Sequence, residues 1–497
     1  MVLRLTKMDL SMSKSRLATL RAACALPPEL PSPEWLRSAG QQVMDAMLDD
    51  FLRLGRDGIG FTGSPREMDR LLGEPPPEAG MDFVQLLADV RAKVVGHSFR
   101  PSHPRFLAFI PGAPTFVSIL GDCLASNANL FAGVWKEASG AAQVEMVVLN
   151  WFKQFLDYSA SAMGLLTGGG SEANLTALVV AREKLSYEDR ARSILYASEQ
   201  RHWSVDRAAK IIGMRPEQIR SVECDDHFRL KMESLHKAVA EDQRAGRLPW
   251  LVLANAGTTN TGSVDPLLPL ADYCAQHGLW LHVDAAYGWP ITLTEEGRTL
   301  LHGIARADSI TLDPHKWFAQ PFEAGCLLVR RGELLAQTFM MRPEYMQDVI
   351  PKHDEVNFCD LGIALTRRFR ALKIWFSIKL LGIAWFRRLI EHDIALAEYA
   401  QGLLEQSGRF DITSRRKLSV VCFRYVPNRR IAADRTDTLQ LAIAEELTRT
   451  GRAFLSTTRL HGRSTLRLCF VNWRTTTADV EEVVGLLQQI GERLEIP

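Results

Sequence analysis

The sequence predicts an α/β protein with a mainly parallel sheet in a large domain and a smaller α/β domain after it. Between about residues 115 and 373, short β-rich runs alternate with segments that have the apolar period of a helix. The β-rich runs are "SILYA", "WLVLANA", "LWLHVDAA", "SITLD" and "GCLLVRR". Parallel strands need crossover connections, which are usually helices, so this alternation is typical of a parallel sheet.

The part of the chain after residue 373 has a different order of elements. Two β-rich runs, "LSVVCFRYV" and "STLRLCFV", occur among helical patterns near "TLQLAIAEELTRT" and "TADVEEVVGLLQQI". This order predicts a smaller α/β sandwich. We therefore expect an N-terminal helical segment over residues 1–114, a large domain over 115–373 and a small C-terminal domain over 374–497.

The N-terminal segment divides into a tail, a helix and a linker. Residues 1 to about 25 lack an apolar period, so we expect a loose tail. A helix follows, with Ser32 as its cap and Pro33 in its first turn. Its apolar residues recur four apart, at Val43, Met47 and Phe51. The run "GEPPPEAG", from Gly73 to Gly80, predicts a linker because its prolines fix φ and remove backbone donors.

The composition is that of an ordinary globular chain and excludes several classes of partner. Of 497 residues, 46% are hydrophobic and 24% are charged, which is enough for a large core. The 59 lysines and arginines nearly cancel the 58 acidic residues, so the net charge of +1 favours neither nucleic acid nor an anionic membrane. We expect partners of neither kind.

Cysteine usage and hydropathy predict a cytoplasmic protein. No run of about eighteen uncharged apolar residues is present, and the first twenty residues alternate charge with apolar groups, unlike a signal peptide. The eight cysteines are scattered without a CxxC pair, as expected for reduced thiols.

Polar residues follow several of the predicted strands. His202 lies after "SILYASEQ", and Thr258 and Thr259 lie in the Gly/Thr loop after "WLVLANA". Asp284 ends "LWLHVD", and Lys316 follows "SITLDPH". Because ligands of parallel sheets bind beyond the carboxyl ends of the strands, we expect these side chains to meet at one crevice.

Three glycines precede Ser171 and a predicted amphipathic helix in "LLTGGGSEANLTALVVAREK". Glycine allows a close backbone approach, and the free amides and dipole at a helix start favour an anion such as phosphate. The P-loop pattern and the dinucleotide pattern GxGxxG are both absent, so a nucleotide site fits poorly.

Each of these residues also has a purely structural interpretation. Lys316 is compatible with an ordinary surface lysine, and Asp284 with a helix cap or the partner of an arginine. His202 and His315 are compatible with hydrogen-bonded structural histidines. A metal site is a further alternative, since His282 and Asp284 share one strand face, but no third ligand occurs at a recognisable spacing.

Taken together, the residues match the contacts that pyridoxal phosphate needs. A lysine forms a Schiff base with the cofactor, and a carboxylate keeps its ring nitrogen protonated so that the ring accepts electrons. A histidine stacks on the ring, and helix-start amides bind the phosphate. We therefore expect pyridoxal 5'-phosphate as the cofactor.

The motifs resemble those of the group II pyridoxal-phosphate decarboxylases, and most closely the aromatic-L-amino-acid decarboxylases. In "HVDAAYG" and "DPHKW" the lysine follows the aspartate by 32 residues (316 minus 284). Further matching segments are "HPRFLAFIPG", "GGGSEANLTAL", "RHWSVDRAA", "GTTNTGSVDP" and "RRFRALKIWF". The resemblance implies the aspartate-aminotransferase fold (fold type I), with a mainly parallel seven-stranded sheet, in a homodimer whose active sites are shared between chains.

The resemblance also implies roles for individual residues. Lys316 would bind the cofactor covalently, and Asp284 would pair with the pyridinium nitrogen. Ala286 would pack beneath the ring and His202 above it, while Thr259 matches a threonine near the cofactor and its aspartate.

Other residues match the phosphate site and a mobile loop. Gly170 and Ser171 match the phosphate-binding segment, and His315 lies near the phosphate in the family. Tyr345, in "RPEYMQDVIPKHDE", matches the loop tyrosine that protonates Cα after carbon dioxide has left.

Four positions are candidates for substrate contacts, and three of them depart from the animal enzymes or lie near the partner chain. Gly112 replaces a threonine, and Trp203 replaces a small serine next to the stacking histidine. Phe131 lies in a segment expected to reach the partner's pocket. Arg467 matches an arginine that relatives direct toward the substrate, or else lies on a solvated strand face.

The expected activity is decarboxylation of an L-amino acid, and the apolar or aromatic pocket positions favour an aromatic one. An oxygen-consuming aromatic aldehyde synthase is the nearest alternative, but such enzymes commonly replace the loop tyrosine with phenylalanine. A decarboxylase of a non-aromatic amino acid and a non-catalytic cofactor-binding homologue are the remaining alternatives.

Overall fold

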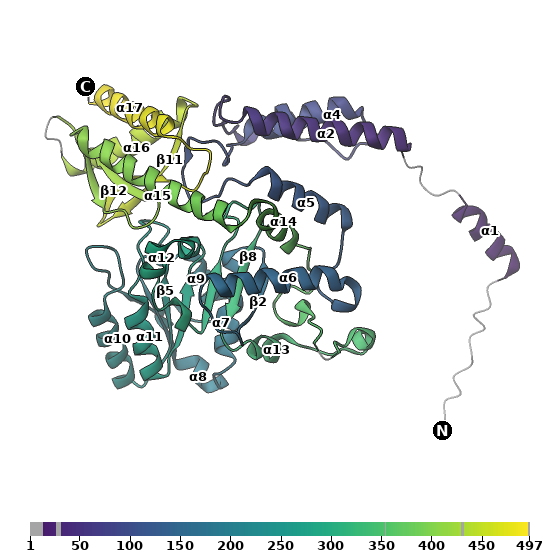
Figure 1. Ribbon diagram of the computed structural model, residues 1–497, viewed down its shortest axis with the longest axis horizontal. Coiled ribbons are helices and arrows are strands. Elements are labelled where there is room, and N and C mark those ends of the chain that lie inside the picture. The colour runs from purple at the N-terminus through teal and green to yellow at the C-terminus, as the bar shows by residue number, and fades with distance from the viewer. Residues whose placement is uncertain (1–12, 26–30, 353, 429–431, 496–497) are drawn as a thin grey trace.

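The structure is a computed structural model that describes residues 13–25, 31–352, 354–428 and 432–495. Figure 1 shows a large sheet with helices around it, a smaller sheet with its own helices near the C-terminus, and a helical arm to one side.

The large sheet has seven strands in the order β2-β8-β7-β6-β5-β3-β4. Only β8 runs against its neighbours β2 and β7, and the remaining pairs are parallel. The strands are β2 (Met163–Thr167), β3 (Ser193–Ser198), β4 (Ile219–Val222), β5 (Leu248–Asn255), β6 (Trp280–Asp284), β7 (Ser309–Leu312) and β8 (Gly325–Val329). The prediction of a mainly parallel seven-stranded sheet is confirmed.

Burial explains why these segments form strands. Every residue of β3, β6, β7 and β8 is buried, because helices cover the sheet. Helix α7 (Gly170–Arg182) packs across β6, β7 and β8, while α10 (Met232–Arg244) and α11 (Leu267–His277) pack against β5. The remaining helices of this part are α5 (Phe116–Ala128), α6 (Trp135–Phe155), α8 (Tyr187–Arg192), α9 (Trp203–Ile211), α12 (Glu295–Leu300), α13 (Glu333–Phe339) and α14 (Ala371–Leu381).

The smaller sheet has five strands in the order β1-β11-β12-β10-β9. They are β1 (Phe106–Leu107), β9 (Phe410–Ser414), β10 (Val420–Tyr425), β11 (Phe454–Leu460) and β12 (Arg463–Cys469). Helices α15 (Ile383–Gln406), α16 (Ala433–Arg449) and α17 (Thr477–Leu494) accompany it. Strand β1 comes from a segment more than 300 residues earlier, and it pairs in parallel with β11.

The N-terminal arm consists of α2 (Pro33–Arg53), α3 (Pro65–Leu72) and α4 (Phe83–Asp89). Ser32 caps α2 by accepting a hydrogen bond from the backbone N–H of Trp35, and Pro33 is in the first turn, as predicted. The predicted linker, residues 73–80, has no regular structure.

The expectation of a loose tail over residues 1 to 25 was wrong for its second half, because α1 (Lys14–Cys24) is a helix there. None of its residues is buried. The Ser13 cap and residues of good helix propensity favour a local helix here, and neither signal depends on the apolar period that tertiary packing requires. Residues 1–12 lie outside the described part of the chain.

A loop from residue 340 to 357 connects α13 with a 3-10 turn at Phe358–Asp360. It contains the 3-10 helix Glu344–Val349, which includes Tyr345. The side chain of Tyr345 lies outside the described part of the structure. None of the described helices is both long and apolar enough to cross a membrane.

Candidate active site

A cavity of about 420 Å³ lies at the carboxyl ends of the large sheet's strands. Its walls come from the start of α7, the segments after β3, β5, β6 and β7, and the start of α9. The lining residues are Gly168, Gly169, Gly170, Ser171, Glu172, Asn174, His202, Ser204, Asn255, Gly257, Thr259, Asp284, Ala286, Tyr287, Asp313, His315 and Lys316. All eight residues that the sequence indicated for the cofactor are therefore in one cavity.

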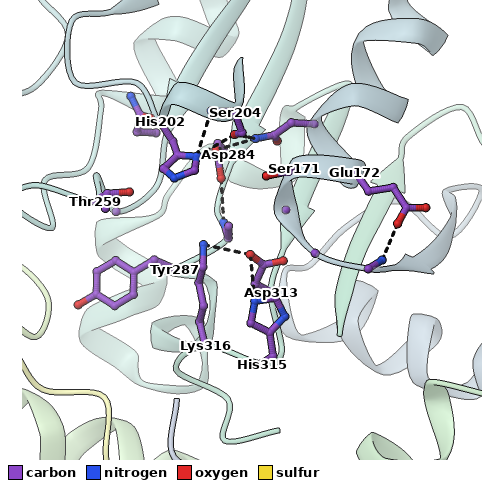
Figure 2. A pocket seen from close by; sticks show the side chains of 17 residues that line it. Ser171, Glu172, His202, Ser204, Thr259, Asp284, Tyr287, Asp313, His315 and Lys316 are labelled. Carbon is purple, nitrogen blue, oxygen red and sulfur yellow. Dashed lines mark hydrogen bonds and ion pairs between the residues drawn. The ribbon is translucent and has the colours of Figure 1, made fainter. Parts of the chain in front are cut away.

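Asp284 ends β6, and it is 8% exposed. Its Oδ2 accepts a hydrogen bond from Asn174 Nδ2 at 2.9 Å, and its Oδ1 accepts one from the backbone N–H of Ala286 at 3.1 Å. These two donors fix the orientation of the carboxylate. Asp284 is therefore a carboxylate of fixed orientation in the wall of the cavity (Figure 2).

A second layer of hydrogen bonds holds Asn174. Its Oδ1 accepts a hydrogen bond from His282 Nε2 at 3.0 Å, and the other nitrogen of that ring contacts Ser309 Oγ at 2.8 Å. Burial lowers the pKa of His282 to about 4, so this ring is neutral. His282 thus supports Asp284 through an amide, and no group of three metal-binding side chains occurs among the described residues.

His202 is the N-cap of α9 and is half-buried. The backbone N–H of Ser204 donates to its Nδ1 at 3.3 Å, and Ser204 Oγ lies 2.8 Å from the same atom. Burial lowers the pKa of His202, although Asp284 opposes the shift. The ring is therefore neutral at pH 7, and because Nδ1 accepts, its proton is on Nε2.

Lys316 follows β7 in a turn, and Nζ lies 3.0 Å from Asp313 Oδ2. Its side chain is 24% exposed, whereas that of Asp313 is 2% exposed. The next residue, Trp317, is fully buried and donates from Nε1 to Asp393 Oδ2 on α15 at 2.9 Å. A rigid backbone therefore directs a flexible amine into the cavity, between Tyr287 and Asp313 (Figure 2).

The glycines before α7 allow the chain to approach its neighbours closely. Gly169 has a φ of 143°, which disfavours other residues, and a Cβ on Gly170 would lie 2.8 Å from Asp313 Oδ2. Gly170 and Ser171 are the first helical residues, so their N–H groups have no carbonyl partner within the helix. Free amides and the positive end of the helix dipole therefore line this end of the cavity.

Two contacts join the cavity to the small sheet. Arg467, on β12, is 4% exposed and donates from Nη1 to the backbone carbonyl of Thr259 at 2.6 Å. Tyr287 Oη lies 2.6 Å from Ser419 Oγ and accepts from the backbone N–H of that serine. The alternative of Arg467 on a solvated strand face is therefore wrong, because the side chain is buried and holds the wall that carries Thr259.

The four candidate substrate residues do not line the cavity in this chain. Gly112 packs against the lysine's backbone: its N–H donates to the His315 carbonyl at 3.2 Å, and a Cβ there would lie 1.7 Å from the Lys316 carbonyl oxygen. Trp203 is 57% exposed and stacks under Arg207, so it is not part of the core. Phe131 is half-buried in the segment between α5 and α6.

Sequence reasoning missed three side chains that hold the site together, namely Asn174, Ser204 and Asp313. Asp313 stands three residues before the lysine, in the same motif, and this proximity was a usable signal. Asn174 is one turn into α7, 110 positions from Asp284, and nothing in its local pattern indicates that contact.

The arrangement fits pyridoxal phosphate. An amine, a fixed carboxylate and a set of free helix-start amides surround one space, and the glycines leave room at the amide end, where a Cβ would collide. These are the groups that a Schiff base, a pyridinium nitrogen and a phosphate require.

Comparisons with known proteins agree with this geometry. The sequence profile described as "Pyridoxal-dependent decarboxylase conserved domain" matches residues 65–426. An aromatic-L-amino-acid decarboxylase of Bacillus atrophaeus is 41% identical over 466 residues, 94% of this chain and 97% of that protein. A phenylacetaldehyde synthase of Petunia hybrida is 31% identical, over 79% of this chain and 80% of its own. A crystal structure of Oryza sativa TDC with PLP and tryptamine is 27% identical, with a TM-score of 0.89, and covers 94% of this chain and 100% of that chain.

Proposed function

Because the chain belongs to the pyridoxal-dependent decarboxylase family, we propose that it decarboxylates an aromatic L-amino acid to the corresponding amine and carbon dioxide. The observation that carries this proposal is the meeting of Lys316, Asp284 and the start of α7 in one cavity. The 41% identity to an aromatic-L-amino-acid decarboxylase over nearly the whole chain supports the substrate class.

Each residue acts on a different part of the cofactor and substrate. Pyridoxal phosphate, when bound, accepts the electron pair of the bond between Cα and the carboxylate as carbon dioxide leaves. Lys316 would hold the cofactor covalently through Nζ, which is the amine that the substrate amine must replace. Asp284 would keep a proton on the ring nitrogen, because a carboxylate beside that nitrogen favours its charged form.

The remaining groups position the reacting atoms. His202 would cover one face of the cofactor ring with its neutral, flat side chain, and Ala286 would pack on the other face. The amides of Gly170 and Ser171 would bind the phosphate, with His315 near it. Tyr345 supplies the proton to Cα from the 340–357 loop.

The charges around the cavity support an uncharged substrate side chain. Among the described residues that line it, no arginine occurs, and the amine is that of Lys316, which the cofactor uses. The buried guanidinium of Arg467 is bound to the Thr259 carbonyl and to Ser456 Oγ. A substrate with a side-chain carboxylate would lack a free cation to pair with it.

We propose further that the protein is a cytoplasmic homodimer. The arm exposes large apolar side chains on α2 and α4, including Leu36 (54% exposed), Leu52 (65%) and Val84 (59%), as an association surface does. All eight cysteines are free thiols, which suits a reducing compartment. Light scattering should give about twice the chain mass, and Leu52→Glu should lower it; a wild-type monomer would refute the dimer.

The function is tested by product analysis. The purified protein, loaded with pyridoxal phosphate, is incubated with phenylalanine, tyrosine and tryptophan, and with glutamate as an acidic control. Carbon dioxide and amine from an aromatic substrate, without peroxide, are the expected products. Aldehyde, ammonia and peroxide with oxygen consumption would show the aldehyde synthase instead, and release of carbon dioxide from glutamate alone would contradict the substrate class.

A further inference from the structure

The proposed mechanism assigns no role to the ion pair between Asp313 and Lys316. Asp313 Oδ2 lies 3.0 Å from Lys316 Nζ, and the other carboxylate oxygen is buried without a hydrogen-bond partner. The carboxylate is 2% exposed, so solvent screens this pair little. A buried carboxylate oxygen without a hydrogen-bond partner lowers the stability of the folded protein. The Asp313 carboxylate is therefore unfavourable for stability alone.

The charged and titratable groups that face Lys316 are Asp313, Asp284, His202, His315 and Tyr287. Burial raises the pKa of Tyr287, whose hydroxyl contacts Ser419, so the phenol is neutral at pH 7. Burial alone would lower the pKa of the lysine, but Asp313 first and Asp284 second outweigh it, and the net shift is upward. Burial lowers the pKa of both histidines, so both rings are neutral at pH 7 and add no repelling charge. The free amine of Lys316 is therefore an ammonium ion at neutral pH.

An ammonium ion cannot attack the cofactor. Attachment forms a C=N bond between Nζ and the aldehyde carbon, breaks the C=O bond and releases one water molecule. Nζ must first lose a proton so that its lone pair is free, and this proton goes to Asp313, the nearest acceptor, which passes it on to the aldehyde oxygen. A second proton moves from Nζ to the same oxygen, which leaves as water, and the third proton of the original ammonium group stays on the nitrogen of the C=N bond. The same requirement applies each time the substrate amine has displaced the lysine.

We propose that Asp313 is the counter-ion of the released Lys316, holding it as an ammonium ion and setting the pH at which its amine can bind the cofactor again. Asp313 is thus a positioning residue for the lysine, and this inference rests on the proposed attachment of the cofactor to Lys316. It assigns a function to the buried carboxylate that the reaction at Cα does not use.

Asp313 also borders the amides that bind the phosphate, since a Cβ on Gly170 would lie 2.8 Å from its Oδ2. Removing the carboxylate would therefore change phosphate affinity as well as the lysine. An experiment with pyridoxal phosphate alone would mix the two effects, so the decisive probe has no phosphate.

The test measures the titration of Lys316 directly. Full-length cofactor-free protein is treated with formaldehyde and cyanoborohydride across a pH series, and methylation of the peptide with Lys316 is quantified by mass spectrometry. In Asp313→Asn the midpoint should fall by about one pH unit or more, because a neighbouring opposite charge is lost. The exposed Lys379 is an internal reference, and its profile should not move.

Glu172→Gln is the matched control, because Glu172 lines the same cavity and accepts from the Gly168 N–H without contacting the lysine. Its Lys316 midpoint should equal that of the wild type. If the Lys316 methylation midpoints of the wild type and Asp313→Asn coincide, the proposal is overturned. If the asparagine variant does not fold, the same comparison is made with Asp313→Ser. The methylation assay contains neither cofactor nor substrate, so it tests the Asp313 proposal alone. The proposed function is tested separately, and failure to decarboxylate aromatic amino acids would refute that function without affecting the methylation result.

Discussion

The floor of the cavity and the 340–357 loop differ in how firmly they hold their functional groups. The floor, which comprises Asp284, Asp313 and Lys316, is on or next to strands of the large sheet, and both carboxylates are less than 10% exposed. In the loop, by contrast, Met341 is 81% exposed and Ile350 is 48% exposed. The groups proposed to hold the cofactor are therefore in the buried core, whereas the expected proton donor is on a more exposed segment.

The loop is held near its ends and also at its middle, where Lys136 Nζ donates to the Asp348 carbonyl at 2.7 Å. Arg342 pairs with Asp360 at 2.9 Å, and Asn357 donates to the Val349 carbonyl at 2.8 Å. Asn357 also accepts from the backbone N–H of Trp135 at 2.9 Å. These contacts connect the loop to itself, to Asp360 and to the start of α6, and none of them involves a strand of the large sheet.

Removing the amine of Lys316 should have the largest effect on turnover. Lys316→Ala should abolish turnover and prevent borohydride from fixing the cofactor to the protein, because no other amine lines the cavity among the described residues. Absorbance and mass spectrometry measure the attachment. Lys379→Ala, an exposed lysine, is the control; undiminished turnover by Lys316→Ala would exclude the lysine from the mechanism.

Removing the Asp284 carboxylate should have the next largest effect on turnover. Asp284→Ala should lower kcat by about 10³-fold or more, because an unprotonated ring nitrogen is a poor electron acceptor, and should weaken cofactor binding as well. Asp272→Ala, a surface acid that is 63% exposed on its side chain, should change neither quantity. A near-normal rate in Asp284→Ala would contradict the pairing with the ring nitrogen.

A change in the loop should affect chemistry without affecting cofactor attachment. Tyr345→Phe should slow amine formation by about 10²–10³-fold, since water replaces only part of the proton supply, and should shift the product toward aldehyde. Amine, aldehyde and peroxide are quantified together. Tyr187→Phe, at an 81% exposed position, is the control; an unchanged product ratio at a near-normal rate would remove Tyr345 from the mechanism.

Loosening the end of the loop should have the smallest effect. Arg342→Ala breaks a partly exposed ion pair of about 1 kcal/mol or less, so kcat should fall by at most about five-fold. Cofactor attachment should remain that of the wild type. Arg331→Ala, which breaks a more exposed pair with Glu333, should have no effect on either quantity. A loss of attachment in Arg342→Ala would show that floor and loop are not independent.

Much of the fold and the cofactor site could be predicted because their signals are local. The alternation of strand and helix patterns predicts a parallel sheet, and Asp284 and Lys316 are placed at strand ends by the strands that precede them. The glycines before α7 likewise predict an anion site from adjacent residues. Such features depend on the direction of the backbone and on the spacing of apolar side chains along it. A few consecutive residues determine both.

The remaining features depend on which elements the tertiary structure brings together. Asn174 meets Asp284 across 110 positions, and Arg467 meets Thr259 across 208. Strand β1, too short to have a period, exists only because β11 offers it a partner. A hydrogen bond between distant residues leaves no repeated pattern in either segment. The sequence by itself therefore determined which chemical groups are present and that they lie at the ends of strands. Only the packing of the sheet and helices decided which residues these groups contact, because that packing brings distant segments together.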